Sequence, residues 1–397
     1  MEASRRYAVY ALLIIVLANF LNYMDRTVVS TMERPLREQF SLSGAEFGLL
    51  WTLFTVGYML CAPFIGYLTD RFRRPRLLAI CILIWSLATI GSGLAPNKYF
   101  LFASRLLIGV GEAGCLIIGP TLISVYFSKK ARGRALSVFF LGLPIGGTAG
   151  YVIGGTFAEH PYWRYAFYLA GLPGIALTFI VATLKDPPRG SSEGVVREVK
   201  IQGIKPYVAL LKTPTLFLII LAQAAAVIFL VPLLHFGAGY FEQFRGMSSK
   251  EASRTLGILA LIGGGLGSML SGIIGDRLSR HHRGAYALMA GIAFWLGLPC
   301  VLLGIYIPTK SIYLPLLGLV CFFYFLCMPA VNTQIANVTN PSQRAMAYAL
   351  AVFVLHLLGD TTAPILFGMV QYLVGRQRAF AYFSVGLFFA GLCCLWA

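Results

Sequence analysis

Long apolar runs alternate with short polar segments along the whole chain. Twelve of these runs are long enough for a helix that crosses a bilayer, which needs about 20 residues. They lie near residues 7–30, 45–69, 77–95, 99–126, 135–157, 163–184, 214–241, 254–275, 285–307, 311–338, 345–374 and 379–397. The pattern predicts an all-α membrane protein with twelve transmembrane helices.

One long polar stretch, residues 185–213, carries Gly, Ser and Pro and divides the spans six and six. We interpret it as a cytoplasmic linker between two domains. Residues 1–184 then form an N-terminal six-helix bundle, and residues 214–397 form a C-terminal one. The last span reaches the final residue without a polar tail, which suggests a trimmed terminus.

The two halves repeat a short motif at the end of their second span. Gly66–Arg71 reads GYLTDR, and Gly272–Arg277 reads GIIGDR. Two parallel six-span halves with a site between them are a transporter plan. With the following RFRRPR loop, the first copy resembles the GxLxDRxxRR signature of the major facilitator superfamily. This resemblance implies the major facilitator fold, with two pseudo-symmetric six-helix bundles.

Composition supports a membrane protein and sets its topology. Hydrophobic residues make up 58% of the chain and charged residues 12%, against about 25% charged in soluble domains. The net charge of +17 comes mostly from short loops, with about twice as many Lys and Arg on one side of the membrane as on the other. The positive-inside rule then places both termini in the cytoplasm, and nucleic-acid binding is excluded.

The metalloprotease and phosphate-binding motifs are absent from the sequence. It contains no HExxH or GxxxxGK[ST] motif, so a membrane enzyme and an ATP-driven pump are both disfavoured. All eight cysteines fall in apolar spans without a CxxC or zinc-ligand spacing. We expect no cofactor and no metal.

The fourth span carries two ionisable residues, Arg105 and Glu112. A charge at the bilayer centre costs about 2.5 to 3.5 kcal/mol on insertion scales, so both side chains must face protein or a polar cavity. Their spacing of two helical turns puts them on one face. Gly109, Gly111 and Gly114 leave little bulk on this helix, so a neighbouring helix or a ligand can approach closely.

Span 1 adds a second acid and a second base, Asp25 and Arg26, on adjacent positions about 100° apart. One of them can face span 4 while the other faces a cavity. We interpret Asp25 and Glu112 as proton-coupling acids that pair with the arginines in one state and are freed or protonated in another. The alternative is a fixed ion-pair cluster that holds spans 1 and 4 together.

Further candidate substrate contacts lie in other spans. His356 and Asp360 are four residues apart on one face of span 11, and the alternative for His356 is an ordinary hydrogen-bonded histidine. Arg26 and Arg105 suit an anionic headgroup. An apolar tail requires a wall of apolar and aromatic side chains. Residues available for this wall, if they face the cavity, are Tyr58, Phe54, Phe139 and Tyr324.

Asp70 and Asp276, in the repeated motif, are candidate gate residues. A carboxylate that faces a helix N-terminus is stabilised by about 0.3 to 1 kcal/mol. Asp70 against span 11 and Asp276 against span 5 would latch the cytoplasmic side; the alternative is that these residues only orient loops during insertion. The arginines assigned to the same gate are Arg71, Arg74, Arg134, Arg277 and Arg344.

Span 5 carries glycines at every fourth position, Gly142, Gly146, Gly150 and Gly154. This spacing indicates close packing against another helix. A rocking interface is the alternative.

Several motifs together resemble the Spinster family of major facilitator transporters. They are NYMDR at 22–26, GYLTDRF at 66–72, SRLLIGVGEAG at 104–114, the pattern at 137–151 and HLLGD at 356–360. The resemblance covers nearly the whole chain and implies a lysolipid or sphingolipid transporter. It also implies that Asp25 and Glu112 are proton-sensitive, with Arg26 and Arg105 as charge partners or phosphate binders. The chain departs from the pattern at TTAP, after HLLGD.

The sequence therefore predicts a proton-coupled secondary transporter of an amphiphilic anion, such as a lysophospholipid or a sphingosine-1-phosphate-like lipid. The alternative is an organic-anion or sugar-acid symporter of the anion:cation symporter type, whose motifs are similar at NYxDR and GEA. We expect a monomer in a bacterial inner membrane.

Overall fold

The computed structural model describes residues 5–157, 162–188, 205–282 and 284–397. Most of these residues are helical, and none of them lies in a strand. All twelve predicted spans are present as helices. Their bounds are Arg6–Thr31, Glu46–Thr69, Arg74–Leu94, Lys98–Tyr126, Lys129–Phe157, Trp163–Ala182, Pro214–Leu234, Arg254–Leu278, Ala285–Tyr306, Lys310–Val338, Arg344–Val374 and Arg376–Trp396.

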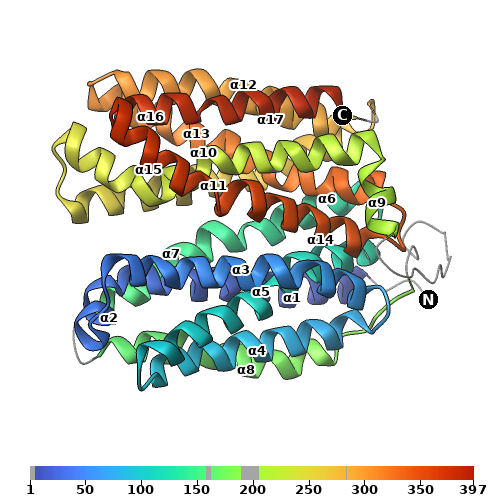
Figure 1. Cartoon of the computed structure of the whole chain (residues 1–397). Helices are drawn as coiled ribbons and strands as arrows, with labels where there is room; N and C mark the ends of the chain where they lie inside the picture. The colour runs from blue at the N-terminus through green and yellow to red at the C-terminus, as the bar shows by residue number, and fades with distance from the viewer. Residues whose placement is uncertain (1–4, 158–161, 189–204, 283) are drawn as a thin grey trace. The chain divides into compact units, whose positions relative to one another are not determined.

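The chain forms two compact units (Figure 1). The first contains the described residues of Met1–Lys129, Phe139–Gln202 and Asn340–Phe353. The second contains those of Lys130–Val138, Gly203–Thr339 and Val354–Ala397. Spans 5 and 11 therefore each contribute a segment to both units. Most of the predicted linker, residues 189–204, lies outside the described residues.

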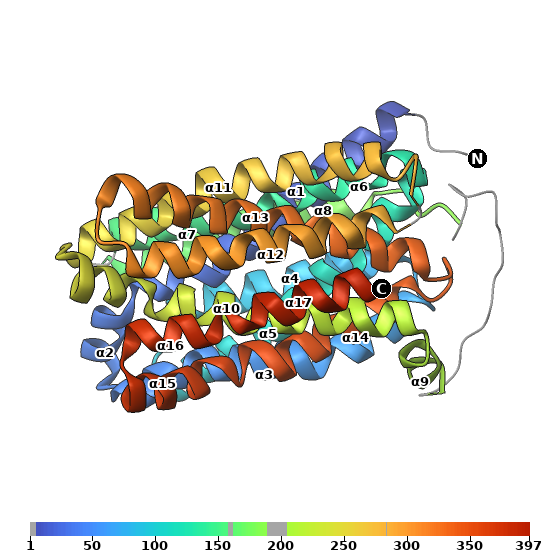
Figure 2. The same cartoon turned by 90° about the horizontal axis from the view of Figure 1, so that it is seen from above.

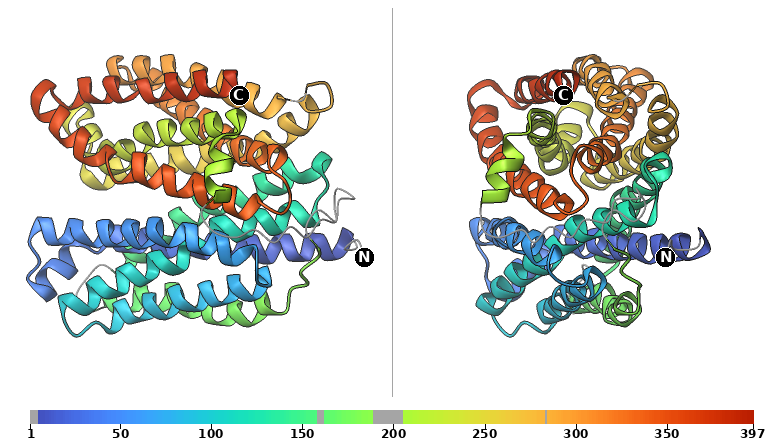
Figure 3. Two further views of the ribbon diagram at one scale, coloured as in Figure 1. Left: turned by 45° about the vertical axis from the view of Figure 1, so that its right-hand side comes forward. Right: turned by 90° about the vertical axis from the view of Figure 1, so that its right-hand side faces the viewer.

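The helices of the first unit include the spans that carry the NYMDR and SRLLIGVGEAG motifs. Figure 3 shows them in blue to green, with α1 in dark blue next to the N label. The unit's helices are α1 (Arg5–Val28), η1 (Val29–Thr31), α2 (Glu33–Phe40), α3 (Gly44–Thr69), α4 (Arg74–Leu94), α5 (Lys98–Tyr126), α7 (Gly142–Phe157), α8 (Trp163–Ala182) and most of α14 (Arg344–Leu355).

Helix starts follow local sequence signals. Ser43 forms a capping box with Glu46 at the start of α3, and Asn97 caps α5 through the backbone N–H of Phe100. Pro75 lies in the first turn of α4, where a missing N–H costs nothing. These signals fix where α3, α4 and α5 begin, and all three helices contribute to the predicted site.

Glycines set the spacing of helices in the first unit. A Cβ added at Gly109 would lie 2.1 Å from the backbone oxygen of Phe54 on α3, and one at Gly111 would lie 2.7 Å from the backbone nitrogen of Trp85 on α4. Cys81 of α4 fills the space beside Gly114. The predicted close approach at these glycines is confirmed, and α5 lies between α3 and α4.

The glycine series of span 5 packs against α1. Added Cβ atoms at Gly146 and Gly150 would lie 2.3 Å from the Phe20 oxygen and 2.4 Å from the Met24 oxygen. The close-packing interpretation of this series therefore holds within the first unit. The span itself starts earlier than predicted, at Lys129, and is broken at Leu141 between α6 (Lys129–Phe140) and α7.

The second unit repeats this packing. Figure 2 shows α11, α12 and α13 side by side, and added Cβ atoms at Gly263 and Gly267 would lie within 2.6 Å of α13 backbone oxygens. The unit also holds most of α6. Its other helices are α9 (Lys205–Leu211), α10 (Pro214–Arg245), α11 (Ser249–Leu278), α12 (Ala285–Tyr306), α13 (Lys310–Val338), η3 (His356–Asp360), α15 (Ala363–Val374), α16 (Arg376–Phe383) and α17 (Val385–Trp396).

Candidate functional site

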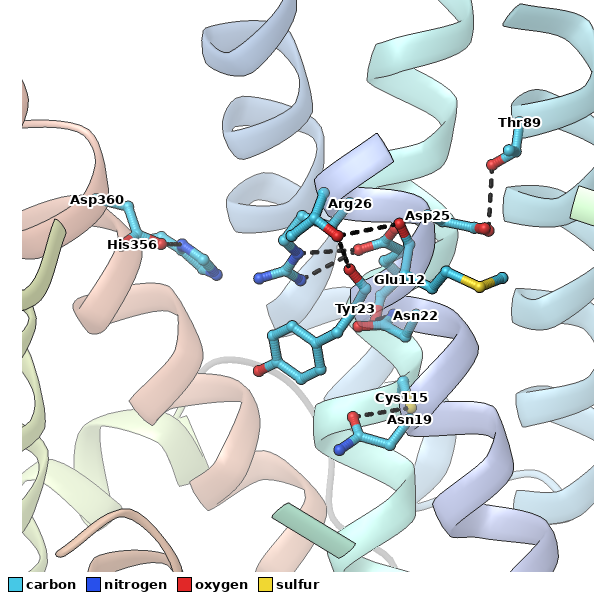
Figure 4. A network of polar contacts seen from close by, with 12 residues as sticks. Asn19, Asn22, Tyr23, Asp25, Arg26, Thr89, Glu112, Cys115, His356 and Asp360 are labelled. Atoms are coloured by element: carbon cyan, nitrogen blue, oxygen red, sulfur yellow. Dashed lines mark hydrogen bonds and ion pairs between the residues drawn. The ribbon is translucent and has the colours of Figure 1, made fainter. Parts of the chain in front are cut away.

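An ion pair joins α1 to α5 in the first unit (Figure 4). Arg26 donates from Nε and Nη2 to the same oxygen of Glu112, Oε2, at 3.2 and 3.1 Å. The Glu112 side chain is fully buried, whereas that of Arg26 is 17% exposed. The other carboxylate oxygen of Glu112, Oε1, has no hydrogen-bond partner among the described residues.

Asp25 does not join this ion pair. It accepts a hydrogen bond of 3.3 Å from the hydroxyl of Thr89 on α4, and Figure 4 shows the two side chains directed toward each other. Asp25 is buried, and its second oxygen has no hydrogen-bond partner among the described residues. Adjacent residues of α1 therefore face different helices, as their angular separation predicts.

Arg105 is fully buried, yet none of its three guanidinium nitrogens has a hydrogen-bond acceptor among the described residues. Its guanidinium carbon instead lies over two aromatic rings of α3, 5.6 Å from the centre of Trp51 and 5.2 Å from that of Phe54. A cation over a ring face is attracted to it, but the contact leaves its N–H groups available.

Aromatic rings also surround Arg26. Its guanidinium carbon lies 4.9 Å from the ring centres of Tyr23 and Phe54 and 5.2 Å from that of Tyr58. Tyr58, a predicted substrate contact, is therefore part of the wall around the Arg26–Glu112 pair and is itself fully buried. Arg26, Arg105, Asp25 and Glu112 therefore lie among α1, α3, α4 and α5.

These side chains are of the types that bind anions and exchange protons. Burying a charge without a hydrogen-bonded partner is costly, so the guanidinium of Arg105 favours an incoming carboxylate or phosphate, which it can bind through a fork of two donors. Desolvation disfavours the charged form of a buried carboxyl, while a neighbouring arginine favours it. Glu112 and Asp25 differ in their contacts with arginine. Of these two acids, only Glu112 accepts hydrogen bonds from an arginine among the described residues.

In the second unit, His356 and Asp360 form the predicted pair. Nδ1 of His356 contacts Oδ2 of Asp360, and His356 is buried. The segment that holds them is a π-helical turn, in which the N–H of Thr361 donates to the oxygen of His356 five residues earlier, at 3.1 Å. Such turns are often found at functional sites. Gly359 lies against Val227 of α10, where an added Cβ would be 2.5 Å from a side-chain carbon.

Asp276, one of the two predicted gate acids, is engaged by span 5. Its Oδ2 accepts from Nε of Arg134 at 2.9 Å, and its Oδ1 accepts from the hydroxyl of Tyr286. Gly133 and Gly272 allow α6 to approach α11 and α12 closely. These groups all belong to the second unit, so the pairing of Asp276 with the start of span 5 is seen within that unit.

The other gate residues have varied surroundings. Arg71 lies over the ring of Tyr67 at 4.1 Å, and Asp70 ends α3. Arg277 is exposed in the last turn of α11, and Arg344 is buried at the start of α14. A latch made by these four residues remains a prediction.

Arg74, another predicted gate residue, contacts the segment that follows span 6, and its role in a gate stays a prediction. Its Nε and backbone N–H donate to Asp186 at 2.7 and 2.8 Å, and its Nη2 donates to the oxygen of Pro187. Arg74 is 2% exposed. This side chain thus fixes the first described residues of the linker to the first unit.

Four residues that contact predicted site or gate residues were not anticipated from the sequence. They are Thr89, Trp51, Tyr286 and Asp186, and none of them belongs to a motif. Thr89 could have been noticed, because it is one of few polar residues in its apolar span. Among the described residues, no group of three or more His, Cys, Asp and Glu side chains is placed to hold a metal ion.

Known proteins resemble this chain over most of its length. The family model described as Major Facilitator Superfamily matches residues 15–364. Protein spinster of Drosophila melanogaster is 27% identical over 375 residues, which are 91% of this chain and 62% of that protein. Protein spinster homolog 3 of Danio rerio is 29% identical over 386 residues, which are 93% of this chain and 78% of that protein. The chain thus spans less than two thirds of the Drosophila protein.

Solved structures share the fold. The crystal structure of a bacterial homolog of the human lysosomal transporter Spinster, inward-facing and unoccupied, has a TM-score of 0.68 at 22% identity and covers 99% of this chain and 98% of that one. The human organic anion transporter MFSD10 (TETRAN) has a TM-score of 0.82 at 15% identity and covers 99% of this chain and 100% of that one. The predicted fold of twelve helical spans is confirmed.

Proposed function

Because this chain is a Spinster-type member of the major facilitator superfamily, whose members are transporters and not enzymes, we propose that it is a proton-coupled secondary transporter of an amphiphilic anionic lipid. The substrate class is a lysophospholipid or a sphingosine-1-phosphate-like lipid. The two bundles alternate in exposing the site. Arg105 and Arg26 bind the headgroup, and Asp25 and Glu112 carry protons.

One observation supports this proposal above the others. Arg105 is fully buried and has no hydrogen-bond acceptor for its guanidinium group among the described residues. A buried, fixed fork of N–H donors favours a carboxylate or a phosphate over a neutral ligand. The rings of Trp51 and Phe54 beside it favour a ligand that also carries apolar surface.

Proton coupling follows from the difference between the two acids. Glu112 pairs with Arg26, whereas Asp25 accepts only a hydroxyl hydrogen bond among the described residues. An anionic headgroup that draws Arg26 away from Glu112 leaves that carboxylate without its counter-ion, and taking up a proton then removes the buried charge. Substrate binding and proton binding at this site therefore favour each other.

The remaining features follow the same proposal. His356 and Asp360, a pair in the second unit, are also substrate-binding residues in this proposal, and Asp276 with Arg134 belongs to the gate. The protein acts as a monomer in a bacterial inner membrane, with both termini in the cytoplasm.

Uptake into proteoliposomes tests the proposal. Lysophosphatidic acid and glucuronate are offered side by side, with and without an imposed proton gradient, to the wild type and to Glu112→Gln. We expect the wild type to move the lysolipid in response to the gradient and Glu112→Gln to lose that response. Glu242→Gln is the matched control, since it makes the same change at an exposed acid of α10.

Three outcomes contradict the proposal in different ways. Uptake of glucuronate without lysolipid uptake would identify an organic-anion symporter. If the wild type takes up the lysolipid at the same rate with and without a proton gradient, transport is not proton-coupled. A gradient response in Glu112→Gln that equals that of the wild type would exclude Glu112 as the coupling acid.

A further inference from the structure

Phe54 of α3 contacts both arginines of the first unit. The guanidinium carbons of Arg26 and Arg105 lie 4.9 and 5.2 Å from the centre of its ring. Among the described residues, each arginine has other ring contacts, but Phe54 is the one ring that the two share. Phe54 is 3% exposed, so these contacts are made out of water, where a cation–ring attraction is strongest.

A direct bond between Arg105 and Glu112 is conspicuously missing. Both side chains lie on one face of α5 and are fully buried, and Oε1 of Glu112 and all three guanidinium nitrogens of Arg105 lack a hydrogen-bond partner among the described residues. A buried arginine and a buried carboxylate stabilise each other when they meet with good geometry. Something must therefore hold the guanidinium of Arg105 elsewhere.

The backbone around Phe54 is fixed against α5. An added Cβ at Gly109 would lie 2.1 Å from the oxygen of Phe54, and one at Gly57 would lie 2.4 Å from the oxygen of Leu106. The ring of Phe54 also packs at 5.9 Å against that of Tyr58. Because α3 and α5 approach closely at Phe54 and again at Gly57, the ring has little freedom to leave its place.

We propose that Phe54 is a positioning residue for the substrate anion, because its ring holds the Arg105 guanidinium away from Glu112 without occupying its N–H groups. A carboxylate in the same place would neutralise Arg105 and use up its donors. An aliphatic side chain would leave the cation free to turn toward Oε1 of Glu112. The aromatic ring does neither, so the fork of donors stays available to a phosphate or carboxylate.

This inference rests on the proposed function, because it assumes that Arg105 binds the headgroup. The test measures KM and Vmax for lysophosphatidic acid uptake in proteoliposomes for Phe54→Leu, Phe54→Tyr and Phe54→Trp. Losing a desolvated cation–ring contact weakens the positioning of Arg105, so we expect Phe54→Leu to raise KM about tenfold, equivalent to about 1.4 kcal/mol, and to leave Vmax within about twofold. The two variants that keep a ring should keep KM close to that of the wild type. Phe64→Leu is the control, since Phe64 lies on the same helix and is 68% exposed.

A double-mutant cycle separates positioning from general packing. In an Arg105→Gln background there is no cation to position, so Phe54→Leu should change KM by less than about twofold. An equal rise in KM in both backgrounds, or a fall in Vmax alone, would show that Phe54 only fills space. A wild-type KM in Arg105→Gln itself would instead reject Arg105 as the headgroup site and with it the proposed binding mode. Arg105→Met, which keeps a long side chain but carries no charge, serves as the background if Arg105→Gln does not fold.

Discussion

Arg26 and Glu112 meet through a single carboxylate oxygen: Nε and Nη2 of the arginine both donate to Oε2, at 3.2 and 3.1 Å. Oε1 therefore remains without a hydrogen bond among the described residues, deep in the first unit. The pair neutralises two charges but leaves part of its hydrogen-bonding capacity unused. An interaction of this kind is easier to exchange than a fork-to-fork pair, in which two parallel bonds must break together.

Arg26→Gln should destabilise the protein in a pH-dependent manner. Removing one partner of a fully buried pair costs about 3 to 5 kcal/mol, and we expect about 2 kcal/mol here because Arg26 is 17% exposed. The loss should be largest at high pH, since at low pH Glu112 takes up a proton and no charge is left uncompensated. Thermal unfolding in detergent across pH measures this. The double variant Arg26→Gln, Glu112→Gln should recover most of the lost stability; equal loss at every pH would argue against the ion pair as its cause.

Thr89→Val should shift the pH dependence of uptake. The hydroxyl of Thr89 donates to the carboxylate of Asp25, so losing it makes protonation of Asp25 easier. The pH at which uptake is half-maximal should rise by up to about one unit, given a hydrogen bond of about 1 to 1.5 kcal/mol. Thr89→Ser keeps the hydroxyl and should retain the wild-type profile. An unchanged profile in Thr89→Val would mean that Asp25 does not titrate during transport.

Gly109→Ala should lower the melting temperature of the protein. The added Cβ would lie 2.1 Å from a backbone oxygen of α3, so two packed helices must separate, and overpacking of this kind costs about 1 to 3 kcal/mol. Gly155→Ala provides the contrast: nothing lies within 4 Å of its added Cβ, and alanine favours a helix over glycine. Similar melting temperatures for Gly109→Ala and the wild type would contradict the close approach of α3 and α5.

The features that follow from periodicity and residue size were predictable. Long apolar runs had to become helices, because a bilayer leaves backbone groups no other partner. Gly109 and Gly111 marked close approaches because any side chain there would occupy the space of a neighbouring backbone. Arg105 and Glu112 had to be buried in protein because lipid does not solvate them.

The pairing within the site was not predictable. Helical spacing shows that Arg105 and Glu112 share a face, but not that Glu112 bonds Arg26 instead. That choice depends on the ring of Phe54 and on where α3 lies, neither of which leaves a periodic signal. The contact of Thr89 with Asp25 was missed because a lone hydroxyl in an apolar span usually bonds to the backbone of its own helix. The contact of Arg74 with Asp186, 112 residues further on, was not predictable either, because no motif links the two residues.

The π-helical turn at His356–Asp360 changes how span 11 relates to its neighbours. A bond that spans five residues instead of four places one additional residue in the turn. Residues before and after it are therefore out of phase by about 100° relative to a continuous α-helix. A helical wheel drawn through the whole span therefore misplaces the face of every residue after the turn by about this angle. An insertion or deletion of one residue there would turn one half of the span against the other while leaving both halves helical.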